Sequence, residues 1–474
     1  MKRSPRKKLV ASFCTVKPMS FNRFSGALAV CVALASPAAA QSEDGATFTP
    51  SQFYALGVSY LRDNNASEAA RVATALLLRN PNDVAALRLA AEAAISQNDF
   101  TSGLKFARSA YFNSENRNNK FASARLAALA ASQMRRDTLA QLWLRRARQF
   151  SPNAATAQNV AEDYRFLRNR NPWSSSLRFG ATPSSNINNG SANEKVSLFD
   201  FPGLFALDGE GRALSGMKIS AGGDTTYRLS QSNTAVTFLT ASADVRTYVL
   251  SGSAKAQAPE ARGRDFSDAT LAFGVRHRRI LSEGARPTDF SLKAGQTWYG
   301  GDPYARFAEG SVGQSFKINP ENQIYVSLSA RRRISLEENP LVSTVALNTR
   351  WRRSLQNNDT LSFGVGVNQT QSDAPDSDYM AVRYTANYNL ADSFYGLRFG
   401  FGVDAETRDF DATQYQSGPR ADKSIAVSMS VEFTNWELYG FRPVMNVRLK
   451  RNKSNVDLFD RDYSSMGFDL RSSF

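Results

Sequence analysis

The sequence contains few of the residues on which most enzyme active sites depend. Among its 474 residues there are two cysteines and a single histidine, His277. A metal cluster built from several histidines is therefore excluded, and any catalytic triad would have to form around this one residue. No arrangement of serine, histidine and asparagine is legible around His277. We therefore expect a protein that is not an enzyme and holds neither a metal nor a cofactor.

The first 40 residues have the three parts of a secretory signal peptide. This segment carries seven lysines and arginines and no acid, an apolar run covers residues 26–34, and three alanines end at Ala40. We predict export and cleavage after Ala40. Cys14 and Cys31 would leave with the signal, which excludes disulfides and cysteine-ligated metals from the mature chain. A lipid anchor on Cys31 is not favoured, because Val30 stands where a lipoprotein signal needs a small residue.

Long apolar runs are also missing after residue 40. None approaches the ~20 residues that a transmembrane helix requires, but a membrane β-barrel needs no such run because alternate residues of its strands face a polar lumen. The net charge of +15 divides into +7 in residues 1–40, +6 in residues 41–172 and +2 in residues 173–474. Since the chain is expected to be exported and carries no recognised nucleic-acid module, we do not expect it to bind nucleic acid.

The composition changes near residue 172, where we place a domain boundary. Residues 41–172 are rich in alanine, leucine and arginine, and small residues recur at about the 34-residue spacing of a tetratricopeptide repeat. Small residues let antiparallel helices approach closely, and proline ends the second helix of a pair. We predict about three stacked helix pairs that bind a peptide or protein, with an ordinary helical bundle as the alternative. The residues assigned to the structure of the repeats are Gly57, Tyr60, Ala69, Pro81 and Pro152.

Residues 173–474 change to a period of two. Ile425, Val427 and Met429 alternate with small and polar residues, which gives one apolar and one polar face. A periplasmic sandwich would alternate in the same way, but the last strand ends on an aromatic residue, as outer-membrane barrels typically do. Together with the export signal, this predicts helical repeats followed by an antiparallel transmembrane β-barrel of about 14 strands. The residues assigned to the barrel-insertion strand are Phe468, Leu470 and Phe474.

The polar face of the predicted strands is rich in basic side chains. Such a wall would attract anions or acidic protein surfaces. The alternative is a structural ladder, in which the arginines pair with lumenal acids such as Asp404, Glu406 and Glu432. His277 falls on the opposite, apolar face, so we expect it on the lipid side. The candidate lumen-lining residues are Arg276, Arg278, Lys293, Arg331, Arg333, Arg350, Arg352, Arg383, Arg398 and Arg448.

Three short motifs of the second half resemble those of one protein family. Residues 181–189 read ATPSSNINN, residues 440–443 read GFRP before a Ser-Asn hairpin at Ser454, and residues 298–301 read WYGG. In this order they resemble the surface lipoprotein assembly modulator family, over essentially all of residues 174–474. The helical half is similar to the family in architecture rather than in individual residues.

The resemblance implies an outer-membrane translocon of the type XI secretion kind, with about 14 strands and a periplasmic repeat domain. Its clients would be surface lipoproteins or soluble secreted proteins, and it would need neither ATP nor a metal. We further expect contacts with periplasmic chaperones, the barrel assembly machinery and outer-membrane lipids, and a monomeric state.

The expected organisation is a signal peptide at residues 1–40, a periplasmic helical domain at 41–172 and an outer-membrane barrel at 173–474. The expected function is delivery of client proteins across the outer membrane. The main alternative is a transport pore, either an exopolysaccharide exporter or an anion-conducting porin. A structural or adhesive surface protein is less favoured, because it would not need a periplasmic repeat domain.

Overall fold

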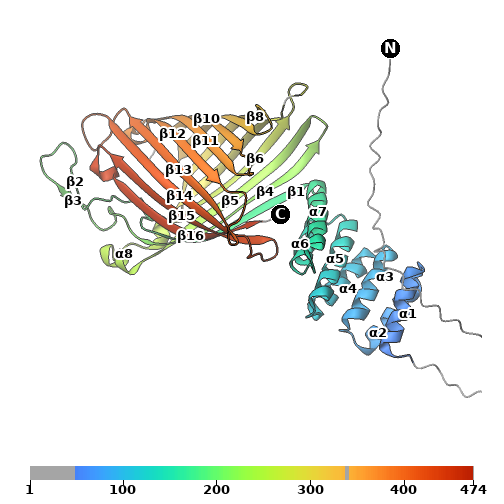
Figure 1. Cartoon of the computed structure of the whole chain (residues 1–474). Coiled ribbons are helices and arrows are strands. Elements are labelled where there is room, and N and C mark those ends of the chain that lie inside the picture. Colours follow the sequence, from blue (N-terminus) through green and yellow to red (C-terminus); the bar gives the residue numbers. More distant parts are fainter. Residues whose placement is uncertain (1–47, 285, 337–340, 473–474) are drawn as a thin grey trace, which may run out of the picture. The chain divides into compact units, whose positions relative to one another are not determined.

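The computed structural model describes residues 48–284, 286–336 and 341–472 (Figure 1). The predicted signal peptide, both cysteines and the terminal Phe474 lie outside the described residues. Within them, no helix is both long and apolar enough to cross a membrane.

Seven helices make up the first region. Their bounds are α1 (Pro50–Arg62), α2 (Ala66–Arg79), α3 (Val84–Ser96), α4 (Phe100–Asn113), α5 (Arg117–Gln133), α6 (Asp137–Gln149) and α7 (Ala154–Arg170). Most begin at a side chain that caps free backbone N–H groups, such as Asp83, whose carboxylate accepts from the amides of Ala85 and Ala86. The number of helices agrees with about three helix pairs, while the tetratricopeptide character stays a prediction.

Alanine and glycine let these helices pack closely. A Cβ at Gly57 would lie 2.4 Å from Leu89 Cδ2 and 2.9 Å from Val72 Cγ1, so no larger residue fits between these helices without movement. The alanines of α3, α5 and α6 are mostly buried. In the same core Trp143 packs edge-on against Tyr111, with 5.3 Å between the ring centroids. The helical core is therefore held by close backbone approach and by a few large aromatic side chains.

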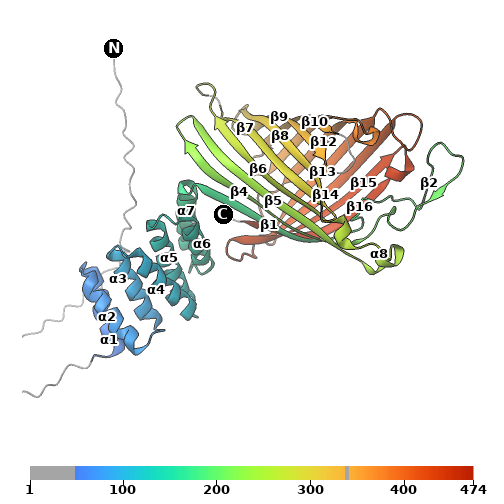
Figure 2. The same ribbon diagram turned by 180° about the vertical axis from the view of Figure 1, so that it is seen from behind.

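The second region is a closed antiparallel barrel in which each strand pairs with its neighbours in sequence and β1 pairs with β16. Figure 1 shows β13 to β16 on one side, and Figure 2 shows β4 to β7 on the other. The barrel strands are β1 (Trp173–Ser184), β4 (Gly216–Gln231), β5 (Ala235–Leu250), β6 (Asp268–Arg279), β7 (Thr288–Tyr299), β8 (Asp302–Lys317), β9 (Asn322–Ser335), β10 (Val342–Ser354), β11 (Thr360–Ser372), β12 (Tyr379–Asn389), β13 (Leu397–Phe410), β14 (Arg420–Phe433), β15 (Phe441–Ser454) and β16 (Arg461–Ser472).

The loops of the barrel hold several short elements. These are β2 (Lys195–Val196), β3 (Phe205–Ala206), α8 (Gly252–Gln257) and the 3-10 turns η1 (Gly263–Phe266), η2 (Pro375–Ser377) and η3 (Asp457–Phe459). A helical region followed by a closed antiparallel barrel of 14 strands confirms the predicted fold class.

The outer face of the barrel is apolar, as the period of two predicts. Register places Phe401, Val403 and Val427 on one face, where their side chains are exposed. Exposed apolar residues around a closed barrel suit contact with lipid. His277 lies opposite Phe290 in register and its Nδ1 is 3.0 Å from Thr237 Oγ1.

The two ends of the barrel differ in their connections. One end, called here the terminal end, holds the start of β1, the last described residues of β16 and mostly short turns, while the other, the loop end, holds the long connections after β1 and β5. At the terminal end Phe394, Tyr395 and Trp436 are strongly exposed. Exposed aromatic side chains at this level are typical of the membrane interface.

The closure between the first and last strands is the least regular pairing in the barrel. Strand β1 pairs with β4 continuously from Trp173 to Ser184. Against β16, the described ladder joins only Gly180, Ala181 and Ser184 to their partners. Pro183 has no N–H group to donate at this edge. The described β1–β16 ladder is therefore short and lies in the half of β1 toward the loop end.

Candidate functional site

Register places the ten predicted lumen residues on the inner face of the barrel. Arg350 and Arg352 lie opposite Gly364 and Ser362 of β11, whereas Trp351 between them stacks on Phe363 with 5.7 Å between ring centroids. The same alternation continues through the paired strands, because directly opposite residues of an antiparallel ladder point to one side.

Six of the ten residues form ion pairs with acids. Such pairs fix strand neighbours but leave little charge free for a ligand. The pairs are Arg278–Asp289 at 2.9 Å, Lys293–Glu309 at 3.0 Å, Arg331–Glu309 at 3.9 Å, Arg383–Glu406 at 2.6 Å, Arg398–Glu432 at 3.6 Å and Arg448–Asp404 at 3.0 Å.

The other four divide into two groups. Arg276 lies over the ring of Phe238 at 4.9 Å, and Arg333 lies over that of Tyr304 at 5.9 Å. Arg350 and Arg352 are exposed to the lumen, and in the described part of the chain neither has a hydrogen bond, an ion pair or an aromatic ring as partner. The structural ladder therefore accounts for most of the basic wall but not for these two residues.

Arg350 and Arg352 border a recess at the terminal end of the lumen. Its volume is about 550 Å³. Among the described residues that line it, Glu432, at 8% exposure, is the one acid. Arg398 approaches Glu432 at 3.6 Å, Arg442 at 3.3 Å and Arg471 at 3.7 Å. We call this recess, with Arg350, Arg352, Arg398 and Arg471, the arginine recess.

Two similar hairpins position the arginines around Glu432. Tyr395-Gly396 and Tyr439-Gly440 each have positive φ at both residues, the backbone of a tight two-residue turn. Each Tyr-Gly pair is followed by one apolar residue and then by an arginine, Arg398 or Arg442. Because the two turns are alike, both arginines start their strands beside Glu432. This Tyr-Gly-x-Arg motif occurs twice in the sequence, at residues 395–398 and 439–442, and is the signal by which the site could have been found.

The turn between β14 and β15 also contacts α6. Arg148 lies 3.2 Å from Glu437, which in turn pairs with Arg442 at 3.0 Å. Gln149 Oε1 accepts the backbone N–H of Tyr439 at 2.8 Å. Nothing in the sequence pattern linked residues so far apart. These contacts connect the last helices of the first region to strands that border the arginine recess.

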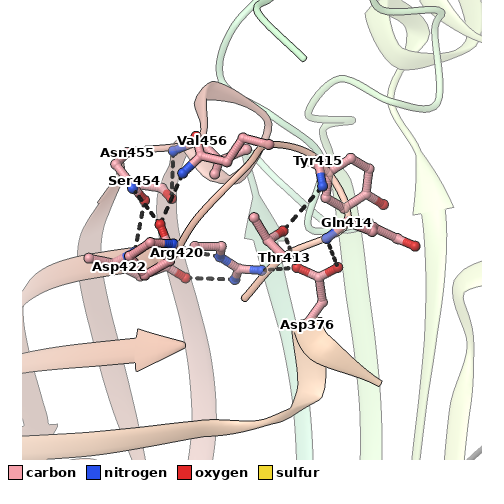
Figure 3. Close-up of polar contacts among 12 residues, drawn as sticks. Asp376, Thr413, Gln414, Tyr415, Arg420, Asp422, Ser454, Asn455 and Val456 are labelled. Atoms are coloured by element: carbon pink, nitrogen blue, oxygen red, sulfur yellow. Dashed lines mark hydrogen bonds and ion pairs between the residues drawn. The ribbon is translucent and has the colours of Figure 1, made fainter. Parts of the chain in front are cut away.

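A second arginine cluster lies at the loop end (Figure 3). The Arg420 guanidinium donates to both carboxylate oxygens of Asp422 at 3.0 and 2.7 Å and to Asp376 at 3.1 Å. It also lies over the rings of Phe410 and Phe459, at 4.0 and 3.3 Å. Asp376 accepts further from the hydroxyl of Thr413 at 2.6 Å. The cluster thus fastens together the loops after β11, β13 and β15.

Two loop-end carboxylates have lowered pKa values. Burial on its own would raise the pKa of Asp460, but the ammonium of Lys453 and the amide of Ser454 outweigh it and hold this pKa below its usual range. Hydrogen bonding from Ser417 lowers the pKa of Asp200. Both carboxylates are therefore stabilised in the charged form, as their role in joining loops requires.

The remaining predicted residues are placed as follows. Ala69 is buried in α2, Tyr60 packs against the same core, and Pro81 and Pro152 follow the ends of α2 and α6. Phe468 and Leu470 are exposed on the outer face of β16. Their proposed roles in repeat structure and barrel insertion stay predictions. In the described ranges, no group of three or more His, Cys, Asp and Glu residues could hold a metal ion.

Comparison with known proteins points to one family. The model of the surface lipoprotein assembly modifier family matches residues 173–474, the whole barrel. No curated protein matches the chain. Solved structures with a similar barrel include OccAB3 of Acinetobacter baumannii (9% identity, 63% of this chain and 98% of that chain, TM-score 0.34) and OprD of Pseudomonas aeruginosa (10%, 62% and 94%, TM-score 0.29). A bacterial polysaccharide outer membrane secretin is also similar (7%, 62% and 98%, TM-score 0.31).

Proposed function

Because this chain belongs to the surface lipoprotein assembly modifier family, we propose that it delivers client proteins, surface lipoproteins in particular, across the outer membrane. The family match supports an outer-membrane barrel of the lipoprotein-assembly kind, and the delivery of clients is what we propose in addition. The observation that carries the proposal is the family match over the entire barrel, from β1 to the end of β16.

In this proposal the terminal end of the barrel faces the periplasm. The helical region precedes β1 directly, since α7 ends at Arg170 and β1 begins at Trp173. An exported chain inserted with its terminal end inward would keep these helices in the periplasm, where they can capture a client held unfolded or by a chaperone. The contacts of α6 with the β14–β15 turn support a transfer from the helices to the barrel.

The incomplete β1–β16 pairing supports a lateral exit. A lipoprotein carries acyl chains that belong in the membrane, and an opening between strands would let them pass from the lumen into lipid. The described ladder at this edge is short, so opening it breaks few hydrogen bonds. A disulfide between Cys residues placed at Gly180 and Asp469, which are paired in register, should block delivery until it is reduced.

The test of the proposed function is deletion of the gene followed by protease treatment of intact cells. A surface lipoprotein encoded nearby should become protected from protease, and return to the surface when the gene is restored. If it is cut equally in both strains while its total amount is unchanged, the proposal is wrong.

The second candidate is an anion-conducting pore, which is favoured by the arginines without acidic partners at positions 350 and 352. An open pore predicts steady, anion-selective conductance of the purified protein in planar bilayers. The translocon predicts small or intermittent conductance, because its lumen serves a polypeptide.

A further inference from the structure

The arginine recess has the properties of a binding site for an extended anion. Of the predicted lumen residues, only Arg350 and Arg352 have no described partner of any kind, and both lie on this recess. They are two residues apart on β10, which separates them by about 7 Å along the strand, at about 3.4 Å a residue. Both guanidiniums can therefore bind carboxylates without first breaking an existing pair.

The rest of the recess adds positive charge and neutral hydrogen-bonding groups. Glu432 approaches three arginines, of which Arg442 also pairs with Glu437, so Arg398 and Arg471 share the single charge of Glu432. Arg442 and Arg471 lie directly opposite each other in register. Like charges in opposed positions repel, so a further anion would relieve the cluster. The neutral polar residues of the lining are Thr360, Ser362, Asn387, Asn389 and Ser430.

The spacing of the arginines excludes one small anion as the ligand of the whole site. Arg352 on β10 and Arg398 on β13 are three strands apart, about 14 Å across the strands at about 4.8 Å a strand. Register also places Arg352 level with Gly402, four residues from Arg398, which adds about 14 Å along the strand. A single phosphate or carboxylate cannot contact both. An extended chain can, and in an extended peptide the side chains of alternate residues also recur at about 7 Å.

We propose that the arginine recess binds an acidic segment of the client polypeptide, in extended form, as it enters the barrel. This inference rests on the proposed function, which supplies a polypeptide as the ligand. Carboxylates at alternate positions of the segment pair with Arg350 and Arg352, and further acids reach Arg398 and Arg471. The asparagines and hydroxyls of the lining bind the peptide backbone, which carries no sequence information. The site therefore selects clients by charge pattern.

The binding test uses the purified full-length protein in detergent. The probe is a fluorescently labelled peptide of Asp-Ser repeats, and a Lys-Ser peptide of the same length is its control. The double variant R350Q/R352Q should weaken binding of the acidic peptide by about tenfold, which is about 1.4 kcal/mol in total, since it removes two charge-assisted contacts at exposed arginines. The control R306Q/R333Q removes an equal number of charges near the loop end, where Arg306 contacts Gln296 on the outer face and Arg333 lies over Tyr304 on the inner face.

The affinity of the control variant for the acidic peptide should be within about twofold of that of the wild type, because Arg306 and Arg333 lie outside the recess. Equal weakening by both double variants, or equal binding of the Lys-Ser peptide, would overturn the inference. So would displacement of the peptide by inorganic phosphate at the same concentration, which would indicate a site for small anions. Migration on an unheated detergent gel shows that each variant is a folded barrel.

A cell assay separates this inference from the proposed function. If gene deletion does not change exposure of the lipoprotein, the proposed function fails. If deletion abolishes exposure but R350Q/R352Q restores it as well as the wild type does, the barrel delivers clients and the recess does not select them. If the recess selects clients, R350Q/R352Q should restore much less surface exposure of the lipoprotein than R306Q/R333Q does.

Discussion

The two ends of the barrel hold arginines in opposite states. At the loop end, Arg420 is buried, and two carboxylates and two aromatic rings occupy its guanidinium. At the terminal end, Arg350 and Arg352 are exposed and have no described partner, and three more arginines share Glu432. A buried arginine whose guanidinium is already paired holds loops together, whereas an exposed arginine without a described partner remains available to a ligand. Arginine content alone does not distinguish these two roles.

The largest expected effect is at the loop end. Replacing Arg420 with Gln leaves Asp422 buried and without its partner, and breaking a buried pair of this kind costs about 3–5 kcal/mol. The loops after β11, β13 and β15 should separate while the strands stay paired. Limited proteolysis of the folded protein should show new cleavage in these loops, and an unchanged digestion pattern would mean that Arg420 does not hold them.

A smaller effect is expected from Glu432→Gln at the terminal end. This change leaves Arg398, Arg442 and Arg471 facing one another without their shared acid. Because the arginines are partly exposed and screened by solvent, we expect a loss of about 1–3 kcal/mol in stability. The measurement is the temperature at which the barrel loses its folded migration on a detergent gel. No shift would mean that the arginines are neutralised by other groups.

Acid should loosen the loop end through Asp460. Its pKa is lower in the folded protein than in the unfolded chain, so its contribution to stability is fully present above about pH 4 and is lost as the pH falls through the folded value. Hydrogen exchange in residues 454–460, corrected for the intrinsic rate, should rise below that pH. The Asp460→Asn variant should show fast exchange at every pH, and a wild type that keeps slow exchange in acid would contradict this assignment.

The smallest effect on stability is expected for R350Q/R352Q. Since neither arginine has a described partner, their removal should change the free energy of unfolding by no more than about 0.5 kcal/mol. The same gel assay measures it, with R306Q/R333Q as the comparison. A loss as large as that of Glu432→Gln would show that the two residues stabilise the barrel, and the contrast between the two ends would then fail.

Much of the fold could be predicted because it depends on local patterns. The alternation of Ile425, Val427 and Met429 indicates both the strand and its lipid face, and the small residue at Gly57 indicates close helix packing. The ion pairs could be predicted only in part, since opposite residues are known only once the register is known. Arg278 and Asp289 belong to strands that are consecutive in the sequence and are thus within reach of sequence reasoning.

The loop-end cluster and the α6 contacts could not be predicted. Asp376 in η2 and Arg420 at the start of β14 are 44 residues apart, and no periodicity specifies how the loops at this end fold over one another. Sequence periodicity likewise does not show which arginines have an acid beside them and which do not. Arg350 and Arg383 are alike in the sequence, and only the position of Glu406 beside Arg383 separates them.

We propose above all that a client polypeptide passes through the lumen beside the arginine recess. A photo-crosslinking amino acid placed at Ser362, which lines the recess, tests this passage in living cells. The neighbouring Phe363 is exposed on the outer face and serves as the matched control. We expect a crosslink between position 362 and the surface lipoprotein, and none from position 363. No crosslink from position 362 in cells that export the lipoprotein, or equal crosslinking from both positions, would contradict it.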